Sequence, residues 1–405
     1  MKKSRFNYKR ILPALAALFC AAGLLGCGVS PGDAAPAETP AAGAQPDADD
    51  FAVLFCNVGK ADAAILRFGD SAVLIDTGSE ESAPQLIAGL NLLGVEKIDA
   101  VFLTHSHADH TGGLSALAAN YDIPMVYAPL YSEQTKKGDG VIVKLCERLE
   151  LPHTELSAGD AVPVADGVTF DVLGPLSLNE DDDNDNSLVL RFTFGRTTFL
   201  FTGDMQFAEE DALLEAGTDV SADVLKVGNH GNPDATSEAF AQAVSPSLAV
   251  ISTDTSVDKD SANTRVLAAL SPAKICITQD YPIGVLLTLD ESGEPAVSSP
   301  ARQESGCQIA VFALAPDEQR LTIQNYGDTE ADLSGCILYC DRSGAALRFP
   351  DGTLLGAGDS LTVSGADGGG DFEFSGEDKP LSKKKSNTVS FYSPLGEKVS
   401  ELEQD

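Results

Sequence analysis

The chain has 405 residues, of which 43% are hydrophobic and 6% aromatic, a length and composition that suit two or three globular domains. Its 61 acidic and 27 basic residues give a formal net charge of −34 at pH 7, which excludes tight non-specific binding of nucleic acid through a broad basic face. The charge does not exclude a metal centre that cuts phosphodiesters, because bound cations can dominate the field around a site.

The first 26 residues have the pattern of a bacterial export signal. Five Lys/Arg precede "ILPALAALFCAAGLLG", an apolar stretch of 16 residues, which is shorter than the roughly 20 that span a membrane. The segment ends in "LLGC", which resembles the bacterial lipobox and implies cleavage before Cys27 and lipidation of that cysteine; an uncleaved anchor or ordinary signal peptide is the alternative. Residues 28–50 are rich in Pro and Ala and predict a tether. We therefore expect an extracytoplasmic lipoprotein, held at the cell membrane through lipid on Cys27.

From residue 51 to about residue 297 the chain alternates strand and helix patterns. Residues 51–59 and 64–78 predict strands, the latter with a Gly–Asp turn, and residues 82–94 predict a helix that stops at Gly94. Further strands are predicted at 98–105, 168–174, 186–195, 197–204, 222–228, 248–253, 274–279 and 285–290, and further helices at 115–121, 206–217, 236–245 and 263–271. Two successive halves of this kind indicate a layered α/β sandwich.

Six cysteines remain after the signal segment and Cys27, and none has the CxxC spacing of metal sites. They are Cys56, Cys146, Cys276, Cys307, Cys336 and Cys340. Most lie in apolar runs, so we expect buried free thiols, with disulfides as the alternative that the compartment allows.

The segment "LTHSHADHTGGL", residues 103–114, holds three of the five histidines within six positions. It follows an apolar strand, so we expect His105, His107, Asp109 and His110 on a loop that can turn several side chains toward one point. Neutral imidazoles and a carboxylate suit zinc, iron or manganese. Histidines that serve only the core are the alternative.

Two later strands end in residues of the same kind. "FLFTGD" ends in Asp204, whose carboxylate can bridge two cations, and "LKVGNHGN" brings His230. Because strand ends can converge at one edge of a sandwich, we expect both side chains to join the first cluster. His153 lies in a predicted loop, and we expect an ordinary surface residue.

These motifs together resemble the metallo-β-lactamase fold. "DTG" at Asp76, "THSHADHTGG" and "TGD" follow its order, and "NVGKADAAIL", "NDNSLVLRF" and "ADVLKVGNHGN" resemble the branch related to the soluble domain of the competence protein ComEC. The resemblance implies an αββα sandwich over residues 51–297 and a metal-dependent hydrolase.

The resemblance also implies a ligand set, which is His105, His107, Asp109, His110, Asp204 and His230. The two leading histidines form one metal site, Asp109 and His110 belong to the other, Asp204 bridges both, and His230 contributes near the second. Asp76 orients the centre, and Asp76 and Asp109 are the expected catalytic carboxylates. The implied nucleophile is a metal-bound hydroxide.

The chain departs from the family pattern at the first of these metal sites. Where many relatives have a further histidine, this chain has only Asn186 and Ser187, and Asn229 replaces one of two adjacent histidines. Asn186 and Asn229 are therefore expected as weak ligands or outer partners. We expect one or two divalent ions, with zinc favoured and manganese or iron as alternatives.

The acidic run "NEDDDNDN", residues 179–186, lacks the Gly and the final Glu of an EF-hand loop. We expect a solvated acidic loop; an extracellular calcium loop is the alternative.

Residues 302–405 show short alternating strands between Gly, Asp and Pro turns, which predicts an all-β sandwich. Their order resembles the immunoglobulin-like lamin-tail domain, which implies a module that binds cell-surface or extracellular ligands.

Two functions remain open from the sequence. The first is a surface-anchored, metal-dependent phosphodiesterase that acts on DNA or another phosphodiester. The second is a surface binding protein with little or no turnover, whose C-terminal β domain mediates the interaction. The retained histidine cluster, Asp204 and His230 favour the enzyme, although a fold by itself does not determine the substrate.

Overall fold

The computed structural model describes residues 51–132, 140–302 and 307–404. The expected signal segment, Cys27 and the tether lie outside the described residues. Within these ranges, no helix combines the length and the apolar character needed to cross a membrane.

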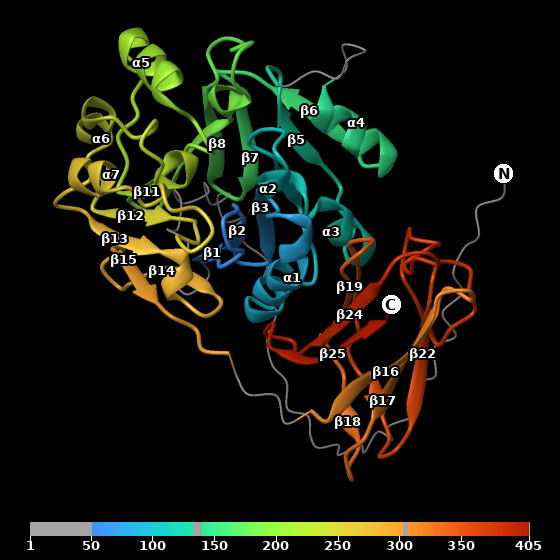
Figure 1. Cartoon of the computed structure of the whole chain (residues 1–405). Coiled ribbons are helices and arrows are strands. Elements are labelled where there is room, and N and C mark those ends of the chain that lie inside the picture. The colour runs from blue at the N-terminus through green and yellow to red at the C-terminus, as the bar shows by residue number, and fades with distance from the viewer. Residues whose placement is uncertain (1–50, 133–139, 303–306, 405) are drawn as a thin grey trace, which may run out of the picture. The chain divides into compact units, whose positions relative to one another are not determined.

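Two β-sheets form the centre of the first part of the chain (Figure 1). One sheet has the strand order β15-β14-β1-β2-β3-β4-β5-β6 and the other the order β13-β12-β11-β10-β9-β8-β7. The first sheet consists of β1 (Phe51–Cys56), β2 (Ala64–Phe68), β3 (Ser71–Ile75), β4 (Ala100–Phe102), β5 (Val126–Pro129), β6 (His153–Leu156), β14 (Gly284–Leu289) and β15 (Pro295–Ser298). The second consists of β7 (Ala161–Ala165), β8 (Val168–Gly174), β9 (Val189–Phe194), β10 (Thr197–Phe201), β11 (Val224–Lys226), β12 (Leu248–Ile251) and β13 (Lys274–Ile277).

The sheets pack face to face through a core rich in phenylalanine. Phe51 of β1 stacks on Phe194 of β9 with ring centroids 4.4 Å apart, and Phe55 of β1 stacks on Phe201 of β10 at 5.6 Å. Alternating strand residues supply this layer because successive side chains of a strand point to opposite faces.

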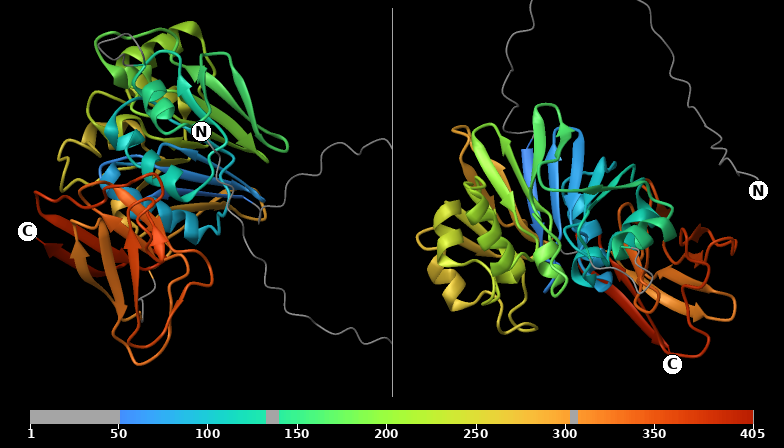
Figure 2. Two further views of the ribbon diagram at one scale, coloured as in Figure 1. Left: turned by 90° about the vertical axis from the view of Figure 1, so that its right-hand side faces the viewer. Right: turned by 90° about the horizontal axis from the view of Figure 1, so that it is seen from above.

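Helices cover the outer face of each sheet (Figure 2). The helices are α1 (Ala83–Leu92), α2 (Ala108–Thr111), α3 (Leu114–Asn120), α4 (Val141–Arg148), α5 (Phe207–Ala216), α6 (Glu238–Val244) and α7 (Thr264–Ala269). Buried residues of α1, α3 and α4 pack against the first sheet, and those of α5, α6 and α7 against the second. The expected αββα sandwich is confirmed.

Most predicted elements are present, and the departures are local. The predicted helix at 82–94 is α1, and the chain leaves it at Gly94 with φ +62°. Strands β5, β6, β7 and β15 and helix α4 were not predicted. The prediction that His153 lies in a loop is wrong. His153 is the first residue of β6, and it pairs with Val126 of β5.

The C-terminal part is all β and has its own apolar core. Its strands are β16 (Ile309–Ala315), β17 (Arg320–Asn325), β18 (Ala331–Asp332), β19 (Ile337–Cys340), β20 (Ala345–Arg348), β21 (Leu354–Leu355), β22 (Ser360–Ser364), β23 (Phe372–Glu373), β24 (Asn387–Tyr392) and β25 (Lys398–Gln404). They form two four-stranded sheets and one two-stranded sheet. The likeness to a lamin-tail domain remains a prediction.

The expectation of buried thiols is confirmed for five cysteines. Cys56, Cys146, Cys276, Cys336 and Cys340 are free and buried. Burial raises the pKa of the Cys56 thiol to about 12, which keeps it protonated and unreactive at neutral pH.

Candidate metal centre

Four strands deliver polar side chains to one edge of the sandwich. β3 and β4 are parallel neighbours in the first sheet, and β10 and β11 are parallel neighbours in the second. Asp76 directly follows β3, the histidine cluster follows β4, Asp204 follows β10, and His230 follows β11. Because the carboxyl ends of parallel strands meet at the same edge, residues up to 154 positions apart come together.

The histidine cluster was expected on a loop, but part of it lies on a helix. His107 is the N-cap of the one-turn helix α2, and Asp109 and His110 lie within that helix. The turn brings the imidazoles close: the ring centroid of His105 is 4.6 Å from that of His107 and 4.1 Å from that of His110.

Glycine allows the close packing behind these motifs. A Cβ on Gly113, in "HTGG", would lie 2.1 Å from the carbonyl oxygen of Thr77. A Cβ on Gly203, in "TGD", would lie 2.8 Å from side-chain atoms of Ser187 and Thr104, and its φ is +51°. Both positions therefore require glycine for the backbone to approach its neighbours.

Asp204 lies between two of the imidazoles. Its Oδ2 is 3.3 Å from Nε2 of His110 and 3.2 Å from Nε2 of His230, and Oδ2 of Asp109 is 3.4 Å from the same His230 nitrogen. One ligand atom from each of Asp109, His110, Asp204 and His230 lies within 4.8 Å of all the others. Two imidazoles and two carboxylates at this spacing suit the coordination of a divalent metal ion.

Outer partners orient these ligands. Nδ1 of His110 donates to Oδ2 of Asp76 at 2.8 Å, and Thr104 donates to both oxygens of that carboxylate. Nδ1 of His230 donates to the carbonyl oxygen of Ser252 at 2.8 Å. Each bond occupies Nδ1 and leaves Nε2 directed at the centre, as in metal sites whose histidines are fixed by a second partner. Asp76 is thus placed where it orients the centre rather than within the four-ligand group.

The electrostatics are those of a cation site. Burial by itself lowers the pKa of His230, but the nearby carboxylates of Asp204 and Asp109 raise it to about 9. Burial likewise lowers the pKa of His110, but the carboxylates of Asp204 and Asp76 outweigh this effect and raise the pKa well above its usual value. Burial raises the pKa of Asp204, but His230 and His110 outweigh this effect and hold the pKa well below its usual range. The carboxylates thus attract positive charge to the imidazoles, and a metal that binds there displaces protons.

The buried atoms fit a metal. Among the described residues, Nε2 of His105, His110 and His230 and Oδ1 of Asp204 are buried and have no hydrogen-bond partner. Buried polar atoms are rarely left without a partner, and a bound cation that accepts lone pairs would supply one for those of His110, Asp204 and His230.

The first of the two implied metal sites is poorer in ligands. His105 is fully buried and His107 partly exposed, and neither belongs to the converging four-residue group. Asn186 is engaged elsewhere: its Oδ1 accepts from Asn179 N, and its Nδ2 donates to Asn179 O and Asp183. Asn229 donates to Asp234. The two asparagines are therefore bonded to other protein groups.

The acidic run at 179–186 is not simply solvated, contrary to expectation. Residues Asp183–Asn186 form a 3₁₀ turn in which Asp185 and Asn186 are buried. Asp183 accepts from the backbone N–H and hydroxyl of Ser106, between the first two histidines, at 3.0 and 2.6 Å. The run and His107 line a pocket of about 590 Å³, so it forms a wall beside the centre.

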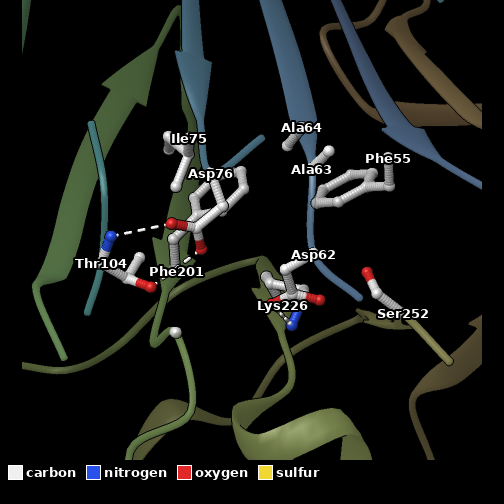
Figure 3. Close-up of a pocket in the computed structure, with 11 residues that line it drawn as sticks. Phe55, Asp62, Ala63, Ala64, Ile75, Asp76, Thr104, Phe201, Lys226 and Ser252 are labelled. Atoms are coloured by element: carbon white, nitrogen blue, oxygen red, sulfur yellow. Dashed lines mark hydrogen bonds and ion pairs between the residues drawn. The ribbon is translucent and has the colours of Figure 1, made fainter. Parts of the chain in front are cut away.

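Sequence reasoning missed a buried ion pair beneath the centre (Figure 3). Nζ of Lys226, the last residue of β11, lies 2.6 Å from Oδ2 of Asp62, and both side chains are at most 5% exposed. They line a small cavity of about 10 Å³ together with Asp76, Thr104 and Ser252. The signal in the sequence was a lone lysine inside the apolar strand "VLKV", which calls for a buried partner.

Replacing Lys226 with methionine should lower the free energy of unfolding by about 3–5 kcal/mol, because it leaves the buried Asp62 carboxylate unpaired. Urea unfolding followed by circular dichroism measures the change. The double variant with Asp62→Asn should recover part of the loss. Asp219→Asn, which breaks an exposed pair with Arg191, should cost less than about 1 kcal/mol and serves as the control. A loss no larger than the control's would contradict a stabilising role for the buried pair.

Comparison with known proteins finds one matching family and several partly matching relatives. Residues 56–255 match the Metallo-beta-lactamase superfamily. The chain is 31% identical over 196 residues to ComE operon protein 3 of Bacillus subtilis, covering 44% of this chain and 25% of that protein. It is 30% identical over 206 residues to competence protein ComA of Neisseria gonorrhoeae, covering 50% and 27%. The chain thus spans about a quarter of the length of these relatives. The solved metallo-beta-lactamase fold protein YhfI from Bacillus subtilis aligns at 16% identity and a TM-score of 0.38, over 56% of this chain and 95% of its own.

Proposed function

We propose that this chain, which carries a metallo-beta-lactamase-fold domain with ComE- and ComA-like homologues, is a metal-dependent phosphodiesterase. The observation that carries the proposal is the convergence of Asp109, His110, Asp204 and His230, with unpartnered nitrogens on both histidines. A divalent metal bound there would act as a Lewis acid toward the phosphoryl group and lower the pKa of a water molecule toward neutrality.

The chain's own residues hold and orient the reacting groups. His110 and His230 present Nε2 because Asp76 and the Ser252 carbonyl hold their other nitrogens. Asp204 faces both imidazoles and supplies negative charge that keeps a cation in place. Asp109, at the exposed side of the group, is the carboxylate best placed to accept a proton from an attacking water, since its side chain is 23% exposed whereas that of Asp204 is 3% exposed.

The proposed setting is the outside of the cytoplasmic membrane, with lipid on Cys27 as the anchor and the tether giving reach. The substrate class rests on the similarity to competence proteins and on the suitability of such a centre for phosphoryl chemistry. DNA and cell-surface phosphodiesters are both within that class. The proposed role of the C-terminal β domain is to bind cell-surface or extracellular ligands near the substrate.

The test is hydrolysis of bis(p-nitrophenyl) phosphate by the chain loaded with zinc, manganese or iron. We expect turnover that a chelator abolishes and added metal restores, because the four-ligand group needs its ion to polarise the phosphoryl group. p-Nitrophenyl acetate and a β-lactam serve as comparison substrates. Turnover of these alone, with none of the phosphodiester, would overturn the proposed substrate class.

A further inference from the structure

Two lysines lie beside the four-ligand group, and they differ in access. Nζ of Lys226 is sealed in the pair with Asp62, and its side chain is 5% exposed. Nζ of Lys60 lies 2.9 Å from Oδ2 of Asp109, and its side chain is 29% exposed. Lys60 therefore reaches the centre from the solvent side, whereas Lys226 supports it from beneath.

The backbone around Lys60 is fixed to the metal-ligand segments. Lys60 lies between β1 and β2, two residues before Asp62. The N–H of Asp62 donates to the carbonyl oxygen of Asp109 at 3.0 Å, and the carbonyl oxygen of Asp62 accepts from Gly78 N at 2.8 Å. These bonds join the segment to α2 and to the turn after Asp76, and the bond from Nζ to Asp109 Oδ2 places the ammonium of Lys60.

The overall charge makes a local cation important. With a net charge of −34, the protein repels an anionic substrate over the screening length of roughly 8–10 Å. Attraction must come from groups at the centre itself. Lysine is protonated at neutral pH unless it is strongly desolvated, and the Lys60 side chain is partly exposed and lies beside a carboxylate. The side chain is therefore charged at neutral pH.

We propose that Lys60 is a substrate-binding residue, whose ammonium binds a non-bridging oxygen of the phosphoryl group held at the metal centre. This inference rests on the proposed function. An ammonium has three donors, and the bond to Asp109 uses one of them, so others are available for an anionic oxygen. A hydrolase for uncharged esters has no need of this second positive charge, whereas a phosphodiester carries one negative charge shared by its two non-bridging oxygens. Lys60 thereby makes the centre selective for anionic phosphoryl substrates.

The experiment compares Lys60→Met and Lys60→Arg in the metal-loaded full chain. We expect Lys60→Met to raise KM for bis(p-nitrophenyl) phosphate at least tenfold and to weaken inhibition by inorganic phosphate by a similar factor. Lys60→Arg should keep both KM and the inhibition constant of phosphate within about threefold of their values in the unaltered chain, because guanidinium also binds phosphoryl oxygens. Bound metal per chain and the midpoint of thermal unfolding should not change.

Lys97→Met is the matched control, since Lys97 also pairs with an aspartate, Asp99, but its side chain is 72% exposed and outside the centre. Unchanged KM and phosphate inhibition in Lys60→Met would overturn the proposal. Loss of metal in that variant would also overturn it, because Lys60 would then act only by holding Asp109. If the unaltered chain has no phosphodiesterase activity, calorimetric binding of inorganic phosphate still tests Lys60, so the two failures are distinguishable.

Discussion

Asp204→Asn should abolish phosphodiester hydrolysis and strip the tightly held metal from the chain. Asp204 is 2% exposed, and its carboxylate lies within 3.3 Å of Nε2 of both His110 and His230. Asparagine keeps the size of the side chain but removes the negative charge that attracts the cation. We expect the loss of metal affinity to exceed the roughly 10–100-fold that is typical when an outer partner is removed.

The measurement is metal content by elemental analysis, with kcat/KM for bis(p-nitrophenyl) phosphate on the same sample. Circular dichroism shows whether the variant is folded. Asp219→Asn is the control for an aspartate far from the centre, paired with Arg191 at the surface. An Asp204→Asn chain that keeps both metal and turnover would remove Asp204 from the centre and the proposed mechanism with it.

One equivalent of metal should bind much more tightly than a second. Asp109, His110, Asp204 and His230 offer four converging ligand atoms, whereas His105 and His107 lie outside that group. The side chain that could have completed their site, Asn186, is bonded to Asn179 and Asp183 instead. A site with two protein imidazoles and a shared carboxylate holds its ion less firmly than one with a full set.

His230→Ala and His105→Ala distinguish the two positions. We expect His230→Ala to lose the tight equivalent and His105→Ala to retain it, in chain purified without chelator or affinity metal. Titration of the metal-depleted chain with a competing chelator gives both affinities. Two equivalents of equal affinity, lost in parallel in both variants, would show that the first site is completed by groups other than Asn186 and would contradict the asymmetry.

The candidate centre illustrates how far the sequence leads. Asp76, Asp204 and His230 each come within four residues of the end of an apolar strand, and parallel strands end at a common edge, so their convergence could be expected before the structure was known. The helical turn of α2 could not, because four residues are too few to show a helical period. His153 was misplaced for a related reason: β6 has four residues, three of them only half-buried or exposed, and shows little apolar pattern.

Local patterns in the sequence were enough to predict the sandwich class, the order of its long elements and the residue types at the centre, since periodicity and strand-end motifs are local properties of the chain. The packing of the two sheets sets which of these residues share a ligand group, that Asn186 is bonded to Asn179 and Asp183, and that Asp62 meets Lys226 and Lys60 meets Asp109. Those pairings join segments up to 164 residues apart. They depend on how the two sheets and their connecting loops pack, and the local pattern of a sequence carries no record of that packing.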